Sequence, residues 1–284
     1  MKYKGRYFIG DMSKICNISK KALRYYDEIN LIPSHRHDYN QYRYYTYESL
    51  LAVPVIKYYK QMGFTLDEMR KFIEGNTANI YKTIQHSFLK KIEELEQEQE
   101  KIRRKHHSVK DWYELVVEAE MVMENNIQEV SIKYVQPSKY LFQNQTFESD
   151  LMAAIINIDF TKHVEDLDNE ITGPVILNFS SYKKRLEKSE QPIRILQKTL
   201  KPLALDNQAS FGGHMMATCY HIGSHDDIEK TYKKIMHWAQ ENNYILHDSS
   251  YERYVTDYWT TRNTSQFVTE VMMRVSREKA SARN

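Results

Sequence analysis

A segment from about residue 77 to residue 126 contains neither proline nor glycine, the two residues that interrupt helices most strongly. Within it, large or apolar side chains recur at alternating steps of four and three residues. These positions are Phe88, Ile92, Leu95, Gln99, Ile102, His106, Val109, Tyr113 and Val116. Because this spacing keeps the side chains on one stripe, the segment is predicted to form one long helix with a heptad seam.

The rest of this helix surface is strongly charged, which leaves the seam as a narrow apolar stripe. Gln99 and His106 interrupt the seam, and polar residues at such positions lower stability but fix register and strand number. We therefore predict a two-stranded coiled coil and a homodimer. The alternative, a long helix that packs against its own chain, stays open.

The long helix divides the chain of 284 residues into three parts. We predict a small N-terminal domain at residues 1–76, a dimerisation helix at 77–126 and a larger domain at 127–284. Residues 1–76 hold 13 Lys and Arg against 8 Asp and Glu, whereas the remainder holds 27 against 30. A basic module joined to a mildly acidic body indicates a nucleic-acid partner.

The composition argues against a membrane or secreted protein. No stretch approaches the roughly 18 consecutive apolar residues of a membrane span. The first residues also lack the apolar core and cleavage site of a secretory signal. The two cysteines, Cys16 and Cys219, fit a reducing compartment, and we expect a cytoplasmic protein.

Two short helices are predicted near the N-terminus. Apolar side chains recur at helical spacing over residues 9–16 and again over residues 20–29. Ser19, in the turn between them, is placed to cap the second helix, and such a pair is typical of a helix-turn-helix. The polar, aromatic and basic segment 34–45 suits a small β-hairpin, here called the wing.

A third helix is predicted to run from a cap at Thr46 to Gly63. Pro54 should kink this helix unless the helix starts later. Residues 65–68 form a capping box that opens a fourth helix, which is expected to end at Gly75.

The second helix and the wing carry side chains suited to DNA. Lys20, Lys21 and Arg24 supply long donors, of which arginine can bond bidentately to guanine while lysine more often holds phosphates. The other candidates here are hydroxyl, basic and aromatic side chains: Ser19, Tyr25, Tyr26, Arg36, Arg43, Tyr44 and Tyr45. For the tyrosines the alternative is filling of the small core, which applies more to Tyr26 and Tyr44 than to Tyr25 and Tyr45.

After residue 126 the pattern changes to strands and helices. Strands are predicted at 130–135, 140–147, 174–182, 192–200, 214–222, 250–258 and 267–275, and helices at 149–157 and 226–242. The order strand, helix, strand occurs over 140–182 and again over 215–258. The predicted fold class is therefore α+β, with a C-terminal domain of two similar halves.

Four blocks near the N-terminus resemble the MerR family of transcription regulators. They are IGDMSK at 9–14, KALRYYD at 21–27, YRYY at 42–45 and KQMGFTLDEM at 60–69. Shorter blocks, YHIG at 220–223, YERY at 251–254 and TEV at 269–271, resemble the GyrI-like effector domain of multidrug-sensing members of that family.

The resemblance implies a homodimer that binds double-stranded promoter DNA. Such dimers kink and untwist an over-long spacer between RNA polymerase elements and activate transcription when a small-molecule effector binds. Arg24, Tyr25, Tyr26 and Lys60 match the family positions that hold phosphates near the centre of the site. Distorting DNA is costly, so many phosphate contacts are required.

Metal sensing is not expected, and no cofactor is implied. The chain has no cysteine between Cys16 and Cys219. His221 and His225, which we expect in a surface loop, are too few for a metal site.

A pocket for an aromatic compound needs aromatic walls and a few placed polar groups. The candidates are Tyr140, Phe142, Tyr182, Tyr220, Trp238, Glu252, Tyr254, Tyr258 and Glu270. Strand alternation predicts that Glu252 shares a face with Tyr254 and Tyr258. Glu252 and Glu270 are candidates for contact with a cationic effector, and the alternative is that each pairs with Arg253, Arg274 or a lysine.

Two other functions stay open. One is a GyrI-like small-molecule hydrolase fused to a DNA-binding module, in which Glu252 beside Tyr254 activates a water. The other is a protein that bends DNA without an effector. No Ser/His/Asp or Cys/His order stands out in the sequence, so we predict a ligand-responsive regulator and not an enzyme.

Overall fold

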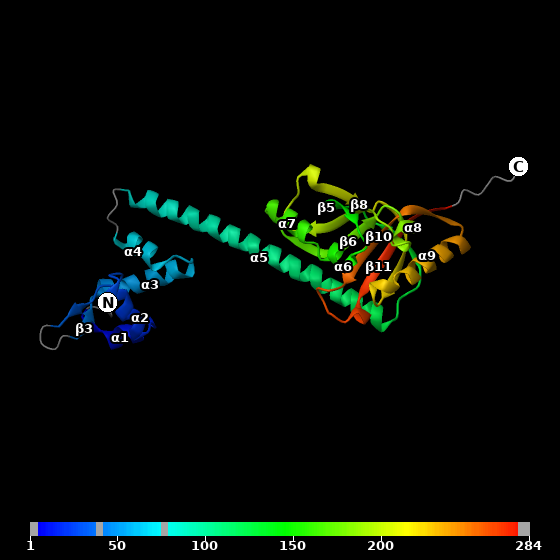
Figure 1. Ribbon diagram of the computed structural model, residues 1–284. Helices are drawn as coiled ribbons and strands as arrows, with labels where there is room; N and C mark the ends of the chain where they lie inside the picture. The colour runs from blue at the N-terminus through cyan, green and yellow to red at the C-terminus, as the bar shows by residue number, and fades with distance from the viewer. Residues whose placement is uncertain (1–4, 38–41, 75–78, 278–284) are drawn as a thin grey trace. The chain divides into compact units, whose positions relative to one another are not determined.

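The structure is a computed structural model that describes residues 5–37, 42–74 and 79–277 (Figure 1). The chain forms two compact units, residues 1–101 and residues 102–284, and helix α5 (Ile80–Glu124) runs through the boundary between them. Among the described helices, none combines the length and the apolar character that crossing a membrane requires.

The N-terminal unit alternates short helices with a small sheet. Its elements are β1 (Tyr7–Phe8), α1 (Ile9–Cys16), α2 (Lys20–Glu28), β2 (His35–Arg36), β3 (Arg43–Tyr45), α3 (Tyr47–Gln61) and α4 (Leu66–Glu74), followed by the first part of α5. The strands form an antiparallel sheet in the order β1-β3-β2, and its hairpin β2–β3 is the predicted wing. The tip of the wing and Gly75, the expected end of α4, lie outside the described residues.

The predicted helix caps are confirmed. The hydroxyl of Ser19 accepts the Ala22 N–H at 3.1 Å, and the hydroxyl of Thr46 accepts the Ser49 N–H at 3.3 Å. At the start of α4 the Thr65 N–H donates to the Glu68 carboxylate at 2.7 Å, as a capping box requires. Helix α3 begins at Tyr47, so the alternative of a later start is wrong and Pro54 lies inside the helix.

The C-terminal unit holds the remainder of α5 and a large sheet. Its elements are β4 (Ser131–Val135), β5 (Ser138–Phe147), α6 (Leu151–Ile155), α7 (Ile158–Asp166), β6 (Ile171–Phe179), α8 (Tyr182–Leu186), β7 (Gln191–Thr199), η1 (Leu205–Asn207), β8 (Gln208–Phe211), β9 (His214–Ile222), η2 (His225–Asp227), α9 (Glu229–Glu241), β10 (Tyr244–Thr256), η3 (Thr264–Gln266) and β11 (Val268–Arg277). Within the described residues the sheet has eight strands, all antiparallel, in the order β4-β9-β11-β10-β6-β7-β5-β8.

This order confirms the predicted duplication and the α+β class. Read from its two edges, the sheet runs β8-β5-β7-β6 and β4-β9-β11-β10, so equivalent strands follow each other and the halves meet where β6 pairs with β10. In each half, helices connect the second strand of the repeat to the third: α6 and α7 join β5 to β6, and α9 joins β9 to β10.

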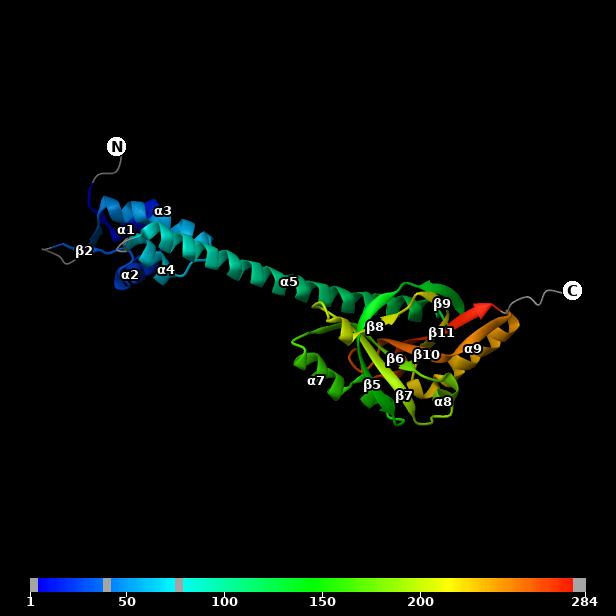
Figure 2. The ribbon, with the colours of Figure 1, turned by 90° about the horizontal axis from the view of Figure 1, so that it is seen from above.

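The two faces of the sheet are covered by different helices. Helices α6, α7, α8 and α9 pack on one face, which we call the helix face, and the end of α5 packs on the other, the α5 face (Figure 2). Because strand side chains alternate, neighbouring residues contact different helices. On β9, for example, Cys219 packs toward α9 and Tyr220 packs toward α5.

Some strand limits differ from the prediction. Strand β6 ends at Phe179, so Tyr182 begins α8 instead of ending a strand. Strand β10 covers 13 residues and ends at Thr256, so Tyr258 lies beyond it. Helices α7 and α8 and strand β8 were not predicted. For α8 and β8 the reason is length, because one helical turn or four residues of strand give too short a periodic pattern.

Helix α5 carries two apolar stripes where one was predicted. Six seam positions are between 43% and 69% exposed in the single chain: Ile92, Leu95, Ile102, Val109, Tyr113 and Val116. Phe88 instead packs on the core of the N-terminal unit. Near the end of α5, Leu115, Ala119 and Val122 pack against the sheet. The alternative that the helix packs against its own chain is therefore correct for Phe88 and for the stripe near the end of α5.

Candidate functional site

The exposed face of α2 carries a row of cations. Lys20, Lys21 and Arg24 are exposed on the first turns of the helix. Beside them, Tyr25 is 50% exposed. Ser19 is also exposed, although its hydroxyl is engaged in capping the helix. This surface offers long cationic donors and a phenol, which are groups that contact base edges and phosphates.

Two of the predicted DNA-binding tyrosines belong to the core. Tyr45 is fully buried, and its hydroxyl donates to the carbonyl of Leu23 at 3.3 Å. Tyr26 is 7% exposed. The expectation that core filling applies less to Tyr45 than to Tyr44 is therefore wrong. Alternation along β3 explains this difference, since it turns Tyr45 inward and leaves Tyr44 half-buried at the surface.

The basic side chains of the wing divide between structure and surface. Arg43 donates from Nε to Asp27 at 2.8 Å and so ties the wing to α2. Burial alone would raise the pKa of Asp27, but hydrogen bonds from Ser34 and Arg43 hold this pKa below its usual range. Arg36 is exposed on β2, and Lys60 is exposed in the last turn of α3.

Sequence reasoning missed one cation at this surface. The guanidinium of Arg6 lies over the ring of Tyr44 at 4.9 Å, and the Arg6 side chain is exposed. Only this ring contact marks Arg6, because it precedes the first predicted helix and belongs to no motif.

The side chains predicted to bind an effector do not gather at one place. Four lie on the α5 face of the sheet: Tyr140, Phe142, Tyr220 and Glu270. Two lie on the helix face: Glu252 and Tyr254. The other three lie outside the strands: Tyr182 on α8, Trp238 on α9, where it stacks on Tyr244 at 5.5 Å, and Tyr258 after β10.

On the helix face, Glu252 is fully buried in a network of four donors. Arg185 from α8 donates to its two oxygens at 2.8 and 3.3 Å. The hydroxyls of Tyr232 on α9 and Tyr254 on β10 donate to the same carboxylate at 2.9 and 2.6 Å. Burial opposes ionisation, but Arg185 and these hydrogen bonds hold the pKa of Glu252 below its usual range. Glu252 is therefore an anion with an internal partner.

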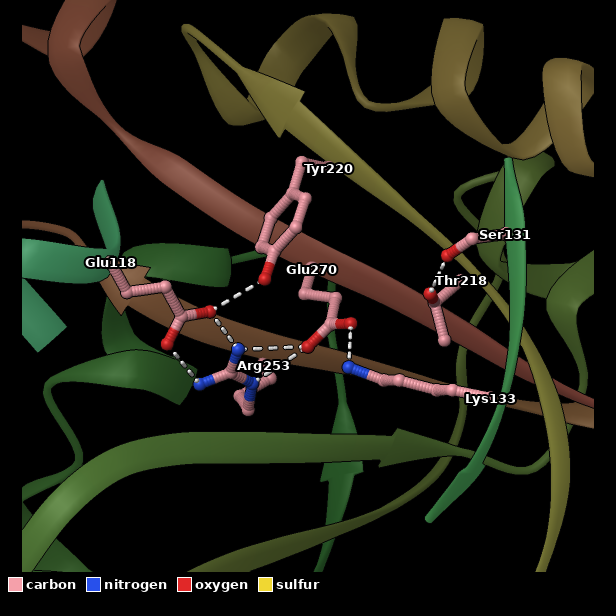
Figure 3. Close-up of polar contacts among 7 residues, drawn as sticks. All are labelled: Glu118, Ser131, Lys133, Thr218, Tyr220, Arg253 and Glu270. Carbon is pink, nitrogen blue, oxygen red and sulfur yellow. Dashed lines mark hydrogen bonds and ion pairs between the residues drawn. The ribbon is translucent and has the colours of Figure 1, made fainter. Parts of the chain in front are cut away.

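On the α5 face, Glu270 is paired with two cations, Arg253 and Lys133 (Figure 3). Its carboxylate accepts from Arg253 Nε at 2.9 Å and contacts the ammonium of Lys133. Burial is again opposed by these charges, which lower the pKa of Glu270. The alternative of pairing with Arg253 or a lysine therefore describes Glu270, whereas Glu252 pairs with Arg185, which the sequence did not indicate.

Arg253 connects this face of the sheet to α5. Its guanidinium contacts both Glu270 and Glu118, and the Nη1–Glu118 Oε2 distance is 3.1 Å. The hydroxyl of Tyr220 donates to the same Glu118 carboxylate at 2.8 Å (Figure 3). Glu118 lies on α5, so an ion-pair network joins three strands to the helix that carries the heptad seam.

A cavity of about 90 Å³ opens beside Arg185. It lies between the end of β5, helix α8 and the start of α9, and its lining includes Phe147, Leu151, Arg185, Lys188, His225 and Ile228. His225 is 7% exposed, and its ring stacks on Phe267 with centroids 5.0 Å apart. Burial lowers the pKa of His225 to about 4, so the ring is neutral at neutral pH.

Both histidines near this cavity differ from the expectation of a surface loop. His221 is 5% exposed and contacts the Thr231 hydroxyl at 3.0 Å and the Ser224 carbonyl at 2.7 Å. The expectation is wrong because α9 covers β9, the strand that holds His221. The ring of His225, which follows that strand, packs against Tyr254, Tyr258 and Phe267. Across the residues that the structure describes, no three His, Cys, Asp or Glu side chains converge as metal ligands.

Comparison with known proteins identifies the two units. Residues 8–45 match the MerR family of regulatory proteins, and residues 128–276 match the GyrI-like small molecule binding domain. The multidrug-efflux transporter 2 regulator of Bacillus subtilis (strain 168) is 25% identical over 283 residues, which are 95% of this chain and 97% of the relative.

Two further relatives match the N-terminal part. The multidrug-efflux transporter 1 regulator of Bacillus subtilis (strain 168) is 47% identical over 66 residues, or 23% of this chain and 24% of the relative. The HTH-type transcriptional regulator CueR of Escherichia coli O6:H1 is 31% identical over 102 residues, or 34% of this chain and 72% of the relative. The chain therefore belongs to the MerR family and is a ligand-responsive transcription regulator with a GyrI-like small molecule binding domain.

Proposed function

We propose that the protein acts as a homodimer that binds promoter DNA through α2 and the wing and activates transcription when a small aromatic compound binds its C-terminal unit. The observation that carries the proposal is the exposed cationic face of α2 in a chain that also holds a small molecule binding domain. Two relatives are named as regulators of multidrug-efflux transporters, which supports a lipophilic effector. RNA polymerase is then a further partner, and the site of action is the cytoplasm.

We assign base contacts and phosphate contacts on DNA to different side chains of the N-terminal unit. Lys20, Lys21 and Arg24 lie on the exposed face of α2 and would enter the major groove, where arginine can read guanine. Tyr25, Arg36 and Lys60 are exposed on three different elements and suit phosphates. Contacts of this kind offset the cost of bending the duplex.

The effector is assigned to the cavity beside Arg185. A signal from this cavity can cross the sheet through neighbouring residues of β10. Glu252 contacts Arg185 on the helix face, and the next residue, Arg253, contacts Glu118 of α5 on the other face. A compound that binds differently to two arrangements of this chain of contacts shifts their populations, which is what activation requires.

Lys60 provides the test of the DNA surface. A duplex is first selected from a random pool by the full-length protein, and its affinity is then measured at several salt concentrations. Lys60→Ala should weaken binding to all duplexes and reduce the salt slope by about one unit, because one phosphate contact is lost. Lys162→Ala removes an exposed lysine of the C-terminal unit and should leave the slope unchanged. Equal slopes for Lys60→Ala and the wild type would contradict the assignment.

Transcription from a promoter that contains the selected site tests the regulatory half of the proposal. An aromatic effector should raise the amount of transcript without being consumed. Recovery of a hydrolysed compound after incubation with the protein would instead support the hydrolase alternative.

A further inference from the structure

The carboxylate of Glu252 has no acceptor position left for a ligand. Its two oxygens offer about four lone-pair positions. Arg185 fills one position on each oxygen, and the hydroxyls of Tyr232 and Tyr254 fill the others. All of these donors belong to the protein itself.

Arg185 also occupies the aromatic surface that a cationic ligand would use. Its guanidinium lies over the ring of Phe179 at 4.9 Å and near Phe147 at 5.6 Å. A carboxylate combined with ring faces is the arrangement that attracts a cation. An external cation would have to displace a guanidinium that is only 7% exposed, and the displaced charge would lose its buried partner.

The groups that lack partners around the cavity are mostly donors, since the neutral ring of His225 offers one N–H and one acceptor nitrogen while Arg185 offers N–H groups alone. A guanidinium has five N–H groups, and within the described part of the chain only two of those of Arg185 donate a hydrogen bond, both to Glu252. The ring nitrogens of His225 are buried and have no hydrogen-bond partner among the described residues. Both side chains line the cavity. Lys188 lines it as well, but its side chain is exposed, so solvent weakens its interaction with a ligand, as it does for two acids beside the cavity.

Two acidic side chains also line the cavity, but they are exposed and have partners. Asp226 accepts the Ser224 hydroxyl at 3.2 Å, and Glu229 pairs with Lys233. Their interactions with a ligand are weakened by solvent. Glu229 is the first residue of α9, a helix of 13 residues whose N-terminus adds positive partial charge at this end.

We propose that this cavity binds a compound through a hydrogen-bond acceptor, as in a carboxylate or an amide carbonyl, and rejects aromatic cations. Arg185 sets this preference, because it neutralises Glu252, lines the cavity and has N–H groups that donate to no acceptor among the described residues. The inference rests on the proposed function, which places the effector in this cavity, and it replaces the expectation that Glu252 contacts a cationic effector.

The test uses three probes of nearly equal shape, benzoate, benzamide and benzamidinium. Each is titrated into the full-length protein, and binding is followed by ligand-observed NMR. Benzoate and benzamide should bind at least about tenfold more tightly than benzamidinium. Arg185→Met should reverse this order, since Glu252 then lacks its cation. Because that variant leaves a buried charge and could unfold, the double variant Arg185→Met with Glu252→Gln is measured beside it. The double variant should no longer bind benzoate more tightly than benzamidinium, and its affinity for benzamidinium should not rise above that of the wild type.

Two controls separate this inference from the proposed function. Arg194→Met removes an exposed arginine on β7 that also lies over an aromatic ring, and it should change nothing. Leu151→Trp fills the cavity from a partly exposed position and should abolish binding of every probe. Tightest binding of benzamidinium to the wild type, lost in Leu151→Trp, would overturn the acceptor preference but keep the effector site. Binding that survives Leu151→Trp would remove the effector site itself. If no probe binds the wild type, the acceptor preference fails, while transcription still tests the function.

Discussion

Adjacent tyrosines of the wing have opposite environments. Tyr44 stacks on His35 with ring centroids 5.4 Å apart and lies under Arg6, whereas Tyr45 is fully buried against α2. Composition could mark the wing as rich in tyrosine, but only the pairing of β3 with β1 and β2 decides which ring turns inward. A residue of the right chemical type in the right segment is therefore not enough to assign a DNA contact.

Two substitutions should separate the core tyrosine from the surface tyrosine. Tyr45→Phe removes a buried hydrogen bond and should lower the free energy of unfolding by about 1 kcal/mol, with DNA affinity unchanged. Tyr25→Ala should weaken DNA binding and leave the free energy of unfolding unchanged. Urea titrations and DNA titrations of both variants check this, and a loss of DNA affinity in Tyr45→Phe alone would reverse the assignment.

Asp257 gives the stability of the C-terminal unit a pH dependence of its own. The side chain is 1% exposed, its Oδ1 accepts the Trp259 N–H at 3.0 Å, and burial raises its pKa to about 6. Because the folded chain favours the protonated acid, the stabilisation is complete below the pKa of the unfolded chain, near 4, and is lost as the pH rises through about 6.

Asp257→Asn keeps the acceptor and removes the titration. At about pH 7.5 the variant should be more stable than the wild type by on the order of 3 kcal/mol, and the difference should vanish below about pH 4. Urea unfolding followed by tryptophan fluorescence measures this difference, and two of the tryptophans, Trp112 and Trp259, have ring centroids 4.5 Å apart. A difference that is constant across this pH range would show that Asp257 is not the titrating group.

At the scale of the element, the helix caps could be predicted from the sequence, but the ion-pair partners of the buried acids could not. The caps of α2, α3 and α4 were predicted because a cap depends on residues within one turn. The two buried acids were also predicted as candidates. Their partners lie far away in sequence, since Arg185 and Glu252 are 67 residues apart and Glu118 and Arg253 are 135 apart. No periodicity links such positions, so the ion pairs could only be seen in the folded sheet.

Helix α5 shows the same limit in one element. The heptad pattern predicted one stripe, and the stripe is present, but Leu115, Ala119 and Val122 form a second one that fits between its positions. A helix that contacts two surfaces needs two stripes, and a search for a single period finds only the longer of them.

The exposed stripe makes a prediction about assembly. Ile102 is 60% exposed, and Ile102→Glu should weaken dimerisation by about a hundredfold or more, because a charge would be buried in the seam twice. Gln97→Glu adds the same charge at another exposed position of α5 and should leave the dimer intact. Sedimentation of both variants over a range of concentrations checks this. Wild-type behaviour of Ile102→Glu would place the dimer contact elsewhere.

For the whole molecule, the path from effector to α5 should be separable from effector binding. Glu118→Gln keeps the shape of the side chain but removes its charge from the network with Arg253. The affinity of the effector should change little, whereas activation of transcription should fall by about fivefold or more, the range of typical coupling energies.

Glu114→Gln is the matched control for this experiment. Glu114 lies one turn earlier on α5, and among the described residues its one ion pair is an exposed pair with Lys110, at 3.7 Å. It should activate like the wild type. If Glu118→Gln and Glu114→Gln activate transcription to the same extent, whether reduced or unchanged, the Glu118 network does not carry the signal.

Because the strand order is repeated, the two halves of the C-terminal unit are arranged like the two subunits of a two-fold dimer, although both belong to one chain. Two separate, identical subunits would have to place the same side chain on both sides of their axis, so an acid at the junction would meet a second acid. In one covalent chain the two halves can differ in sequence, so the two sides of the junction can carry different side chains. One half supplies Arg185 and the other supplies Glu252, and the two meet across the junction of β6 and β10. The cavity beside them therefore has unlike walls, and selection can alter one wall to suit a new compound while the other stays as it is.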